Sequence, residues 1–230
     1  MARLSRLSLA RVAHLVLLRG HNGETVFRDD EDRHMFLEAL HAAFEREHVA
    51  LHAYALLTDL SWLLCTPEQD RGLSRAMQSL GRRFAAAFNR RHQRSGSLWD
   101  GRYRATLVEP GRTLLGAMVF VDQLPADPAS VAGADPTPSP SSSARQHLGF
   151  DGPMQLRDIA EYWALGNTPF DRATAYRALL NESARPAEAE RIVAAVQKGW
   201  ALGSSDFIEA LRLRTARPLQ PRRRGRPRLA

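Results

Sequence analysis

The chain has 230 residues, of which 44% are hydrophobic and 25% are charged, as in ordinary soluble globular proteins. No apolar run approaches the roughly 18 residues that cross a bilayer, and the single cysteine excludes an internal disulfide framework and a Cys-based zinc finger. The net charge of +7 favours a polyanionic partner. His14 interrupts the first apolar segment, so we interpret that segment as a strand rather than a signal peptide and expect a cytoplasmic protein without membrane contact.

The spacing of apolar residues predicts alternating strands and helices over the first half of the chain. An acidic first turn after Asp29 or Asp30 marks one helix start, and Thr113 is the expected N-cap of another. The expected elements are strand 12–18, helix 30–48, strands 49–57 and 61–66, helix 72–91, strand 103–108 and helix 113–124. This β-α-β-β-α-β-α order predicts an α+β fold, with a ferredoxin-like antiparallel sheet and helices on one face.

Changes in composition divide the chain into four parts. Residues 1–124 form the expected ferredoxin-like domain, and residues 125–146, rich in Pro, Ala and Ser, form a linker. Residues 147–211 form a small helical C-terminal module, in which Thr168 and Ser204 or Ser205 are helix caps. Residues 212–230 form an Arg-rich tail that we expect to be disordered.

Arginine is concentrated in two blocks. The tail holds eight arginines and no acid, and residues 82–104 hold seven arginines against one aspartate. Aromatic residues such as Trp99 and Tyr103 interleave with the second block, which favours nucleic-acid contact over a merely solvated helix face. Arg224-Gly225-Arg226-Pro227 in the tail resembles an AT-hook core, with a low-complexity basic tail as the alternative.

Several stretches, in their order and spacing, resemble the REP-associated tyrosine transposases, a branch of the HUH single-tyrosine transposases. These stretches are Arg19–Asn22, Val26–Arg33, Leu51–Leu57, Phe88–His92, Gly101–Glu109 and Ala201–Ser204. The resemblance implies the same ferredoxin-like fold, binding to hairpin DNA, a dimeric habit and, in active members, a divalent metal such as Mg²⁺.

The chain departs from this family at the positions that carry the family's chemistry. The family has a His-x-His pair that binds the metal, a tyrosine that attacks the phosphate, and a polar side chain one turn later. Here Leu60 and Trp62 replace the histidines, Phe120 replaces the tyrosine, and Leu124 replaces the polar residue. None of these side chains is a metal ligand or a nucleophile. We therefore predict a DNA-binding protein without catalytic residues, metal or cofactor, which neither cleaves nor joins DNA.

Two alternatives stay open from the sequence: an active enzyme for single-stranded hairpin DNA with a rearranged metal site, and a relic without a selected role. The residues available for a rearranged site are His14, His52, Asp59, Asp122 and Gln123. Trp62 either fills the vacated pocket or stacks on an unpaired base. Cys65 is expected to be a small buried strand residue.

The expected partner is DNA, single-stranded or hairpin, and the family habit favours a homodimer. The side chains expected to contact DNA are Arg82, Arg83, Asn89, Arg90, Arg91, Arg102, Arg224 and Arg226.

Overall fold

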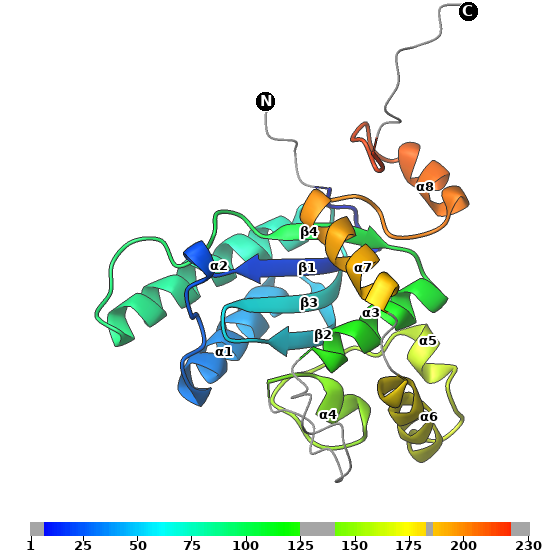
Figure 1. The fold of residues 1–230 in the computed structure, drawn as a ribbon, viewed down its shortest axis with the longest axis horizontal. Coiled ribbons are helices and arrows are strands. Elements are labelled where there is room, and N and C mark those ends of the chain that lie inside the picture. Colours follow the sequence, from blue (N-terminus) through cyan, green and yellow to red (C-terminus); the bar gives the residue numbers. More distant parts are fainter. Residues whose placement is uncertain (1–6, 125–140, 183–185, 222–230) are drawn as a thin grey trace, which may run out of the picture.

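A computed structural model describes residues 7–124, 141–182 and 186–221. Its centre is a four-stranded antiparallel sheet in the order β2-β3-β1-β4 (Figure 1). The strands are β1 (Ala13–Arg19), β2 (Val49–Leu56), β3 (Leu60–Pro67) and β4 (Arg104–Val108). The predicted α+β class and antiparallel sheet are confirmed. No helix within the described segments is long and apolar enough to span a membrane.

Helices α1 (Asp30–Arg46) and α2 (Gly72–Arg91) cover one face of the sheet. The side chain of Asp29 caps α1 by accepting a hydrogen bond from the Asp32 amide. Helix α2 turns one apolar stripe inward, which consists of Leu73, Met77, Leu80, Phe84 and Phe88. These side chains form a core with Val16 and Leu18 of β1.

The opposite face of the sheet is also covered, by α3 (Arg112–Gln123) and α7 (Pro186–Lys198). Helices α5 (Ala160–Trp163) and α6 (Pro169–Asn181) pack against α3. The expectation of helices on one face therefore holds only for α1 and α2, and the second layer of helices is a correction to it. The physical reason lies in β1, whose Leu15 and Leu17 point to one face while Val16 and Leu18 point to the other. A strand that is apolar on both faces needs cover on both.

The edge of β2 is paired with a segment that the sequence analysis assigned to the linker 125–146. The Leu56 amide donates to the Ser141 carbonyl (2.8 Å), and the Ser143 amide donates to the Tyr54 carbonyl (3.0 Å). Ser143 is fully buried, and the short helix α4 (Ala144–His147) follows it directly. Residues 141–146 are therefore packed structure, whereas residues 125–140 lie outside the described residues.

The edge of β4 is covered by the C-terminal part of the chain. Leu202 donates its amide to the Leu107 carbonyl (2.8 Å) and accepts from the Glu109 amide (2.9 Å). Helix α8 (Ser205–Arg212) follows, and Leu219 is only 3% exposed in a small core with Leu107. The expected disordered tail, 212–230, is therefore corrected: residues 212–221 fold back onto the body, and residues 222–230 lie outside the described part.

The predicted helix caps are mostly observed. Thr168 forms a capping box with Asp171 at the start of α6, and the Ser204 side chain caps α8. Helix α3 differs, because it begins at Arg112 with Gly111 at the N-cap position, so Thr113 lies inside the first turn. Gly111 has a φ of 88°, a conformation that favours glycine.

Candidate functional site

The residues at the positions that the resemblance assigns to metal binding lie on β3, in the middle of the sheet. Leu60 begins the strand, and Trp62 is two residues further on, so both point to the face covered by α3. Trp62 is paired in register with Leu17 of β1 and Ala55 of β2. Its side chain is only 4% exposed.

Helix α3 brings Phe120, the residue at the position that the resemblance assigns to the nucleophile, against Trp62. The two rings meet edge to face, with centroids 5.3 Å apart and planes at 85°. Leu60 and Leu124 are half-buried and pack into the same apolar cluster. The fold thus joins the four positions that the sequence analysis singled out, and it joins them as a hydrophobic contact. A base has no open face of Trp62 on which to stack, so the structure favours the pocket-filling interpretation.

The two histidines considered for a rearranged metal site are buried and hydrogen-bonded elsewhere. His14 Nδ1 lies 2.7 Å from the Val12 carbonyl, and Nε2 accepts from the Leu9 amide (3.3 Å). Burial lowers the pKa of His14 to about 4. His52 lies between the Arg157 carbonyl (2.6 Å) and the Thr66 hydroxyl (2.8 Å), and burial lowers its pKa as well.

The two other candidate ligands beside these positions, Asp59 and Gln123, also have partners. Asp59 lies 3.7 Å from the Arg19 guanidinium, and the Gln123 amide donates to the Leu180 carbonyl (2.9 Å). Within the described residues, no cluster of three or more His, Cys, Asp or Glu side chains has the arrangement to hold a metal ion.

Asp122, the last of the candidate ligands, is the centre of a buried polar network. Its carboxylate accepts hydrogen bonds from His147 Nδ1 (2.6 Å), the Tyr176 hydroxyl (2.7 Å) and the Ser143 hydroxyl. Burial, together with the Asp122 charge, raises the pKa of Tyr176 far above its ordinary value. The network fastens the end of α3 to α4 and α6, so Asp122 has a structural task that sequence reasoning missed.

Cys65 is a buried strand residue, as expected. It is fully buried on the α1–α2 side of β3, and burial raises the pKa of its thiol.

Two of the side chains expected to contact DNA, Arg91 and Asn89, have hydrogen-bond partners within the fold. Arg91 donates to Asp29 (2.7 Å) and to the fully buried Asp32 (2.6 Å), and this contact lowers the pKa of Asp29 to about 2. His92 also lies 2.8 Å from Asp32. These contacts join the end of α2 to the start of α1. Two of the stretches that resemble the family, Val26–Arg33 and Phe88–His92, therefore have a structural role in this fold.

Asn89 has a similar positioning role. Its side-chain amide donates to the Gly96 carbonyl (3.0 Å) and accepts from Arg94 (3.0 Å). Asn89 therefore braces the loop that follows α2.

The other predicted contacts of the folded part, Arg82, Arg83, Arg90 and Arg102, are exposed and have no ion-pair or hydrogen-bond partner among the described residues. Arg82 and Arg102 line one cleft, with a volume of about 700 Å³, between α2 and residues 96–103. Arg83 and Arg90 lie outside it. Arg224 and Arg226 are outside the described residues, so their role stays a prediction.

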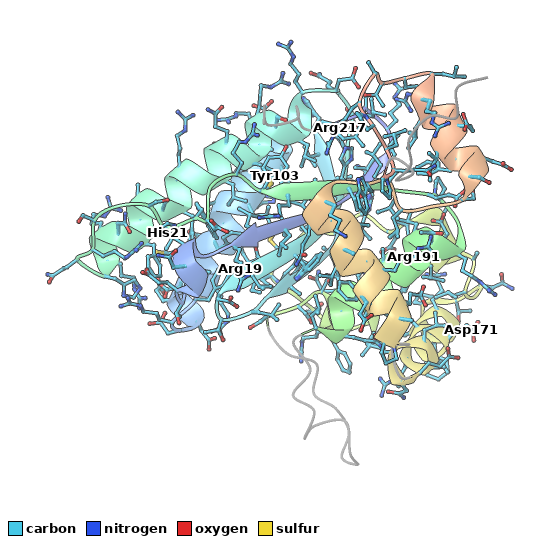
Figure 2. All side chains as sticks on the ribbon, turned by 45° about the horizontal axis from the view of Figure 1, so that its top comes forward. Arg19, His21, Tyr103, Asp171, Arg191 and Arg217 are labelled. Carbon is cyan, nitrogen blue, oxygen red and sulfur yellow. The ribbon has the colours of Figure 1, made fainter. Side chains whose placement is uncertain are left out.

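The cleft also contains residues that sequence reasoning missed, Arg19 and Arg71. Arg19 and Tyr103, which are labelled in Figure 2, lie at the same end of the sheet and both line the cleft. Arg71 stands eleven residues before Arg82, a spacing of about three helical turns. That spacing was visible in the sequence and could have pointed to Arg71.

Comparisons with known proteins agree with this architecture. The sequence matches no family profile and no curated protein. Among solved structures, a REP-associated tyrosine transposase bound to a REP hairpin superposes with a TM-score of 0.53 and 12% sequence identity, covering 70% of this chain and 96% of the other. The chain has the fold of a REP-associated tyrosine transposase. The family resemblance seen in the sequence is confirmed at the level of the fold.

A second solved structure, a candidate transposase from Deinococcus radiodurans, has 17% sequence identity and covers 47% of this chain and 88% of its own. Its TM-score of 0.36 is too low for a comparison of folds. The assignment to the transposase fold therefore rests on the REP-associated tyrosine transposase.

Proposed function

We propose that this protein is a DNA-binding protein on a transposase fold that neither cleaves nor joins DNA strands. The observation that carries the proposal is the contact between Trp62 and Phe120. Strand cleavage by a tyrosine needs a nucleophilic oxygen beside a bound metal ion. At the positions that the resemblance assigns to this chemistry, the chain has two buried rings packed edge to face.

The proposal of DNA binding rests on charge and on the fold. Beyond the net charge of +7, the described part carries exposed arginines without partners, including Arg71, Arg82 and Arg102. Arginine binds phosphate with two parallel hydrogen bonds, so unpaired arginines favour a polyanion. The solved transposase with the same fold is bound to a REP hairpin, which makes single-stranded or hairpin DNA the first ligand to test.

The decisive experiment separates binding from chemistry. The protein is incubated with single-stranded hairpin DNA and Mg²⁺ or Mn²⁺, and the same sample is run on a native and on a denaturing gel. We expect a shifted band on the native gel and no covalent adduct on the denaturing gel. An adduct mapped to any tyrosine, for example Tyr54 or Tyr103, would establish the alternative of an active enzyme with a rearranged site. The variant Phe120→Tyr is the matched control, and it should form no adduct because the metal-binding histidines are still absent.

A homodimer and a cytoplasmic location remain part of the proposal. Both edges of the sheet pair with the chain's own segments, so a dimer has to form through another surface. Light scattering on the purified protein, with and without hairpin DNA, measures the assembly directly.

A further inference from the structure

The cleft between α2 and residues 96–103 has walls that are held in place from several sides. The Asp100 amide donates to the Arg19 carbonyl (2.8 Å), and the His21 amide donates to the Leu98 carbonyl (2.9 Å). Gly20 lies between these contacts, and a Cβ there would stand 2.2 Å from the Glu24 carbonyl oxygen, so a larger residue does not fit. The loop is therefore fixed to the end of β1.

The charge inside the cleft is strongly positive. Five arginines line it against one acid, Asp100. Two of the five have partners, since Arg75 is paired with Glu47 and Arg19 faces Asp59. The three arginines that have no partner within the described part of the chain are Arg71, Arg82 and Arg102.

Aromatic rings form another part of the wall. Trp99 is half-buried, donates its indole N–H to the Gly81 carbonyl (3.1 Å) and packs against Phe36 and Phe84. Tyr103 is half-buried as well, with its hydroxyl 3.1 Å from the Ser74 hydroxyl. Both rings are thus held before any ligand arrives, and a held ring loses little conformational freedom when a flat partner stacks on it.

We propose that this cleft binds single-stranded DNA, with an unpaired base against Trp99 and Tyr103 and the neighbouring phosphates on Arg71, Arg82 and Arg102. The inference rests on the proposed DNA-binding function and specifies its ligand. Stacking on aromatic rings combined with a positive groove is how proteins bind single strands without reading their sequence. A volume of about 700 Å³ is in the range of small-molecule sites and admits a flat base.

The cleft is separate from the positions of the family's chemistry. It lies beside α2, whereas Trp62 and Phe120 lie under α3 on the opposite face of the sheet. Binding in the cleft therefore does not depend on an intact catalytic site.

Neighbouring arginines on α2 provide a matched test, because Arg82 lines the cleft and Arg83 does not. The probe is a thymidine oligomer of about 12 nucleotides, within the site sizes of roughly 4–16 nucleotides of single-strand binders. We expect Arg82→Ala to weaken binding about fivefold and to lower the slope of log K against log salt by about 0.7. Arg83→Ala should leave both values close to those of the unchanged protein.

Photochemical cross-linking shows where the oligomer binds on the protein. The same oligomer, with 5-iodouracil in place of thymine, is irradiated in the complex, and the tryptic peptides are analysed by mass spectrometry. We expect the adduct on Trp99, within the peptide Ser95–Arg102, or on Tyr103.

The possible results separate this inference from the proposed function. The cleft assignment is overturned if Arg82→Ala and Arg83→Ala lose affinity for the oligomer equally, or if the adduct lies only outside residues 95–104. Either result leaves the proposal of DNA binding intact. Tighter binding to a uridine oligomer than to the thymidine oligomer overturns DNA as the ligand of the cleft. Absence of binding to the thymidine oligomer and to every hairpin overturns both proposals.

Discussion

The two faces of the sheet have been used in opposite ways. On the α3 face, the positions that the resemblance assigns to the family's chemistry are filled by Trp62, Phe120 and their apolar neighbours. The adjacent carboxylate of Asp122 is enclosed by three hydrogen-bond donors. Beside α2, at the end of β1, an open cleft is lined by arginines that have no partner in the described residues. The α3 face is packed and its buried polar groups are hydrogen-bonded, whereas the cleft beside α2 exposes positive charge without a partner in the described residues.

The comparison shows that the residues that stabilise the fold and the residues that are free to bind a ligand lie in different parts of the molecule. A buried apolar contact and a satisfied polar network stabilise the fold and offer nothing to a ligand. Unpaired arginines contribute little to stability, because an exposed charge is already well solvated. Changes on the α3 face should therefore act on folding, whereas changes at the cleft should act on DNA binding. Substitutions on the two sides of the sheet test this division.

The largest effect is expected from Asp122→Ala. It leaves His147, Tyr176 and the Ser143 hydroxyl without their buried acceptor, which should lower the free energy of unfolding by about 3–5 kcal/mol. Denaturant unfolding measures the loss. The control is Asp59→Ala, which removes a surface pair at 3.7 Å and should change stability by less than about 0.5 kcal/mol. Equal losses in the two variants would contradict a structural role for the network.

Trp62→Ala should lower the free energy of unfolding by a comparable amount, about 3–5 kcal/mol. The substitution empties a site that is 4% exposed and removes the ring contact with Phe120. Thermal unfolding gives the stability, and titration with the thymidine oligomer gives the affinity. The affinity of the folded variant should be unchanged. A clear loss of affinity in folded protein would mean that Trp62 touches DNA and that the α3 face also binds.

The pH dependence of stability should report His14, which is fully buried on β1 with its pKa lowered from 6.5 to about 4. The unfolded chain takes up this proton first, so the contribution is complete above pH 6.5 and is lost as the pH falls toward 4. The loss is about 3 kcal/mol, measured by denaturant unfolding across that interval. His14→Gln should flatten this part of the profile, whereas the exposed His34→Gln should leave it as it was. An unchanged profile in His14→Gln would assign the dependence to other groups.

Removal of residues 222–230 should hardly alter stability, because Leu219, the buried anchor of the C-terminal segment, is kept. The truncation removes five arginines, so the slope of log K against log salt on single-stranded DNA should fall by about 3.5. Truncation of 212–230 is the informative comparison, since it also removes Leu219 and should destabilise the protein. A slope that does not respond to the shorter truncation would show that the tail does not contact DNA.

Most elements of the fold could be predicted from local patterns. The helix from Gly72 to Arg91 is observed with the bounds that its apolar stripe predicts, and each strand end differs from the prediction by at most one residue. Thr168 and Ser204 cap the helices for which they were expected. These features depend on residues a few positions apart, so the sequence carries them directly.

The candidate site could be predicted only in part. Leu60, Trp62, Phe120 and Leu124 were singled out by their positions, and the fold brings them into one apolar cluster. The basic residues were less predictable, because a sequence shows that an arginine is present and not what it faces. Arg91 turned out to be held by Asp29 and Asp32, about sixty positions away in the chain.

The sequence by itself determined the α+β order of elements, the excess of arginine, and the apolar residues at the positions that the resemblance assigns to the family's histidines and tyrosine. Only the tertiary structure decided that Ser141–Ser143 and Leu202 cover the two edges of the sheet, that Asp122 is enclosed, and that Arg82 opens into a cleft while Arg83 does not. The physical reason is the range of the interactions. Periodicity and capping are local, whereas edge pairing, buried hydrogen bonds and the walls of a cleft join residues far apart in the chain.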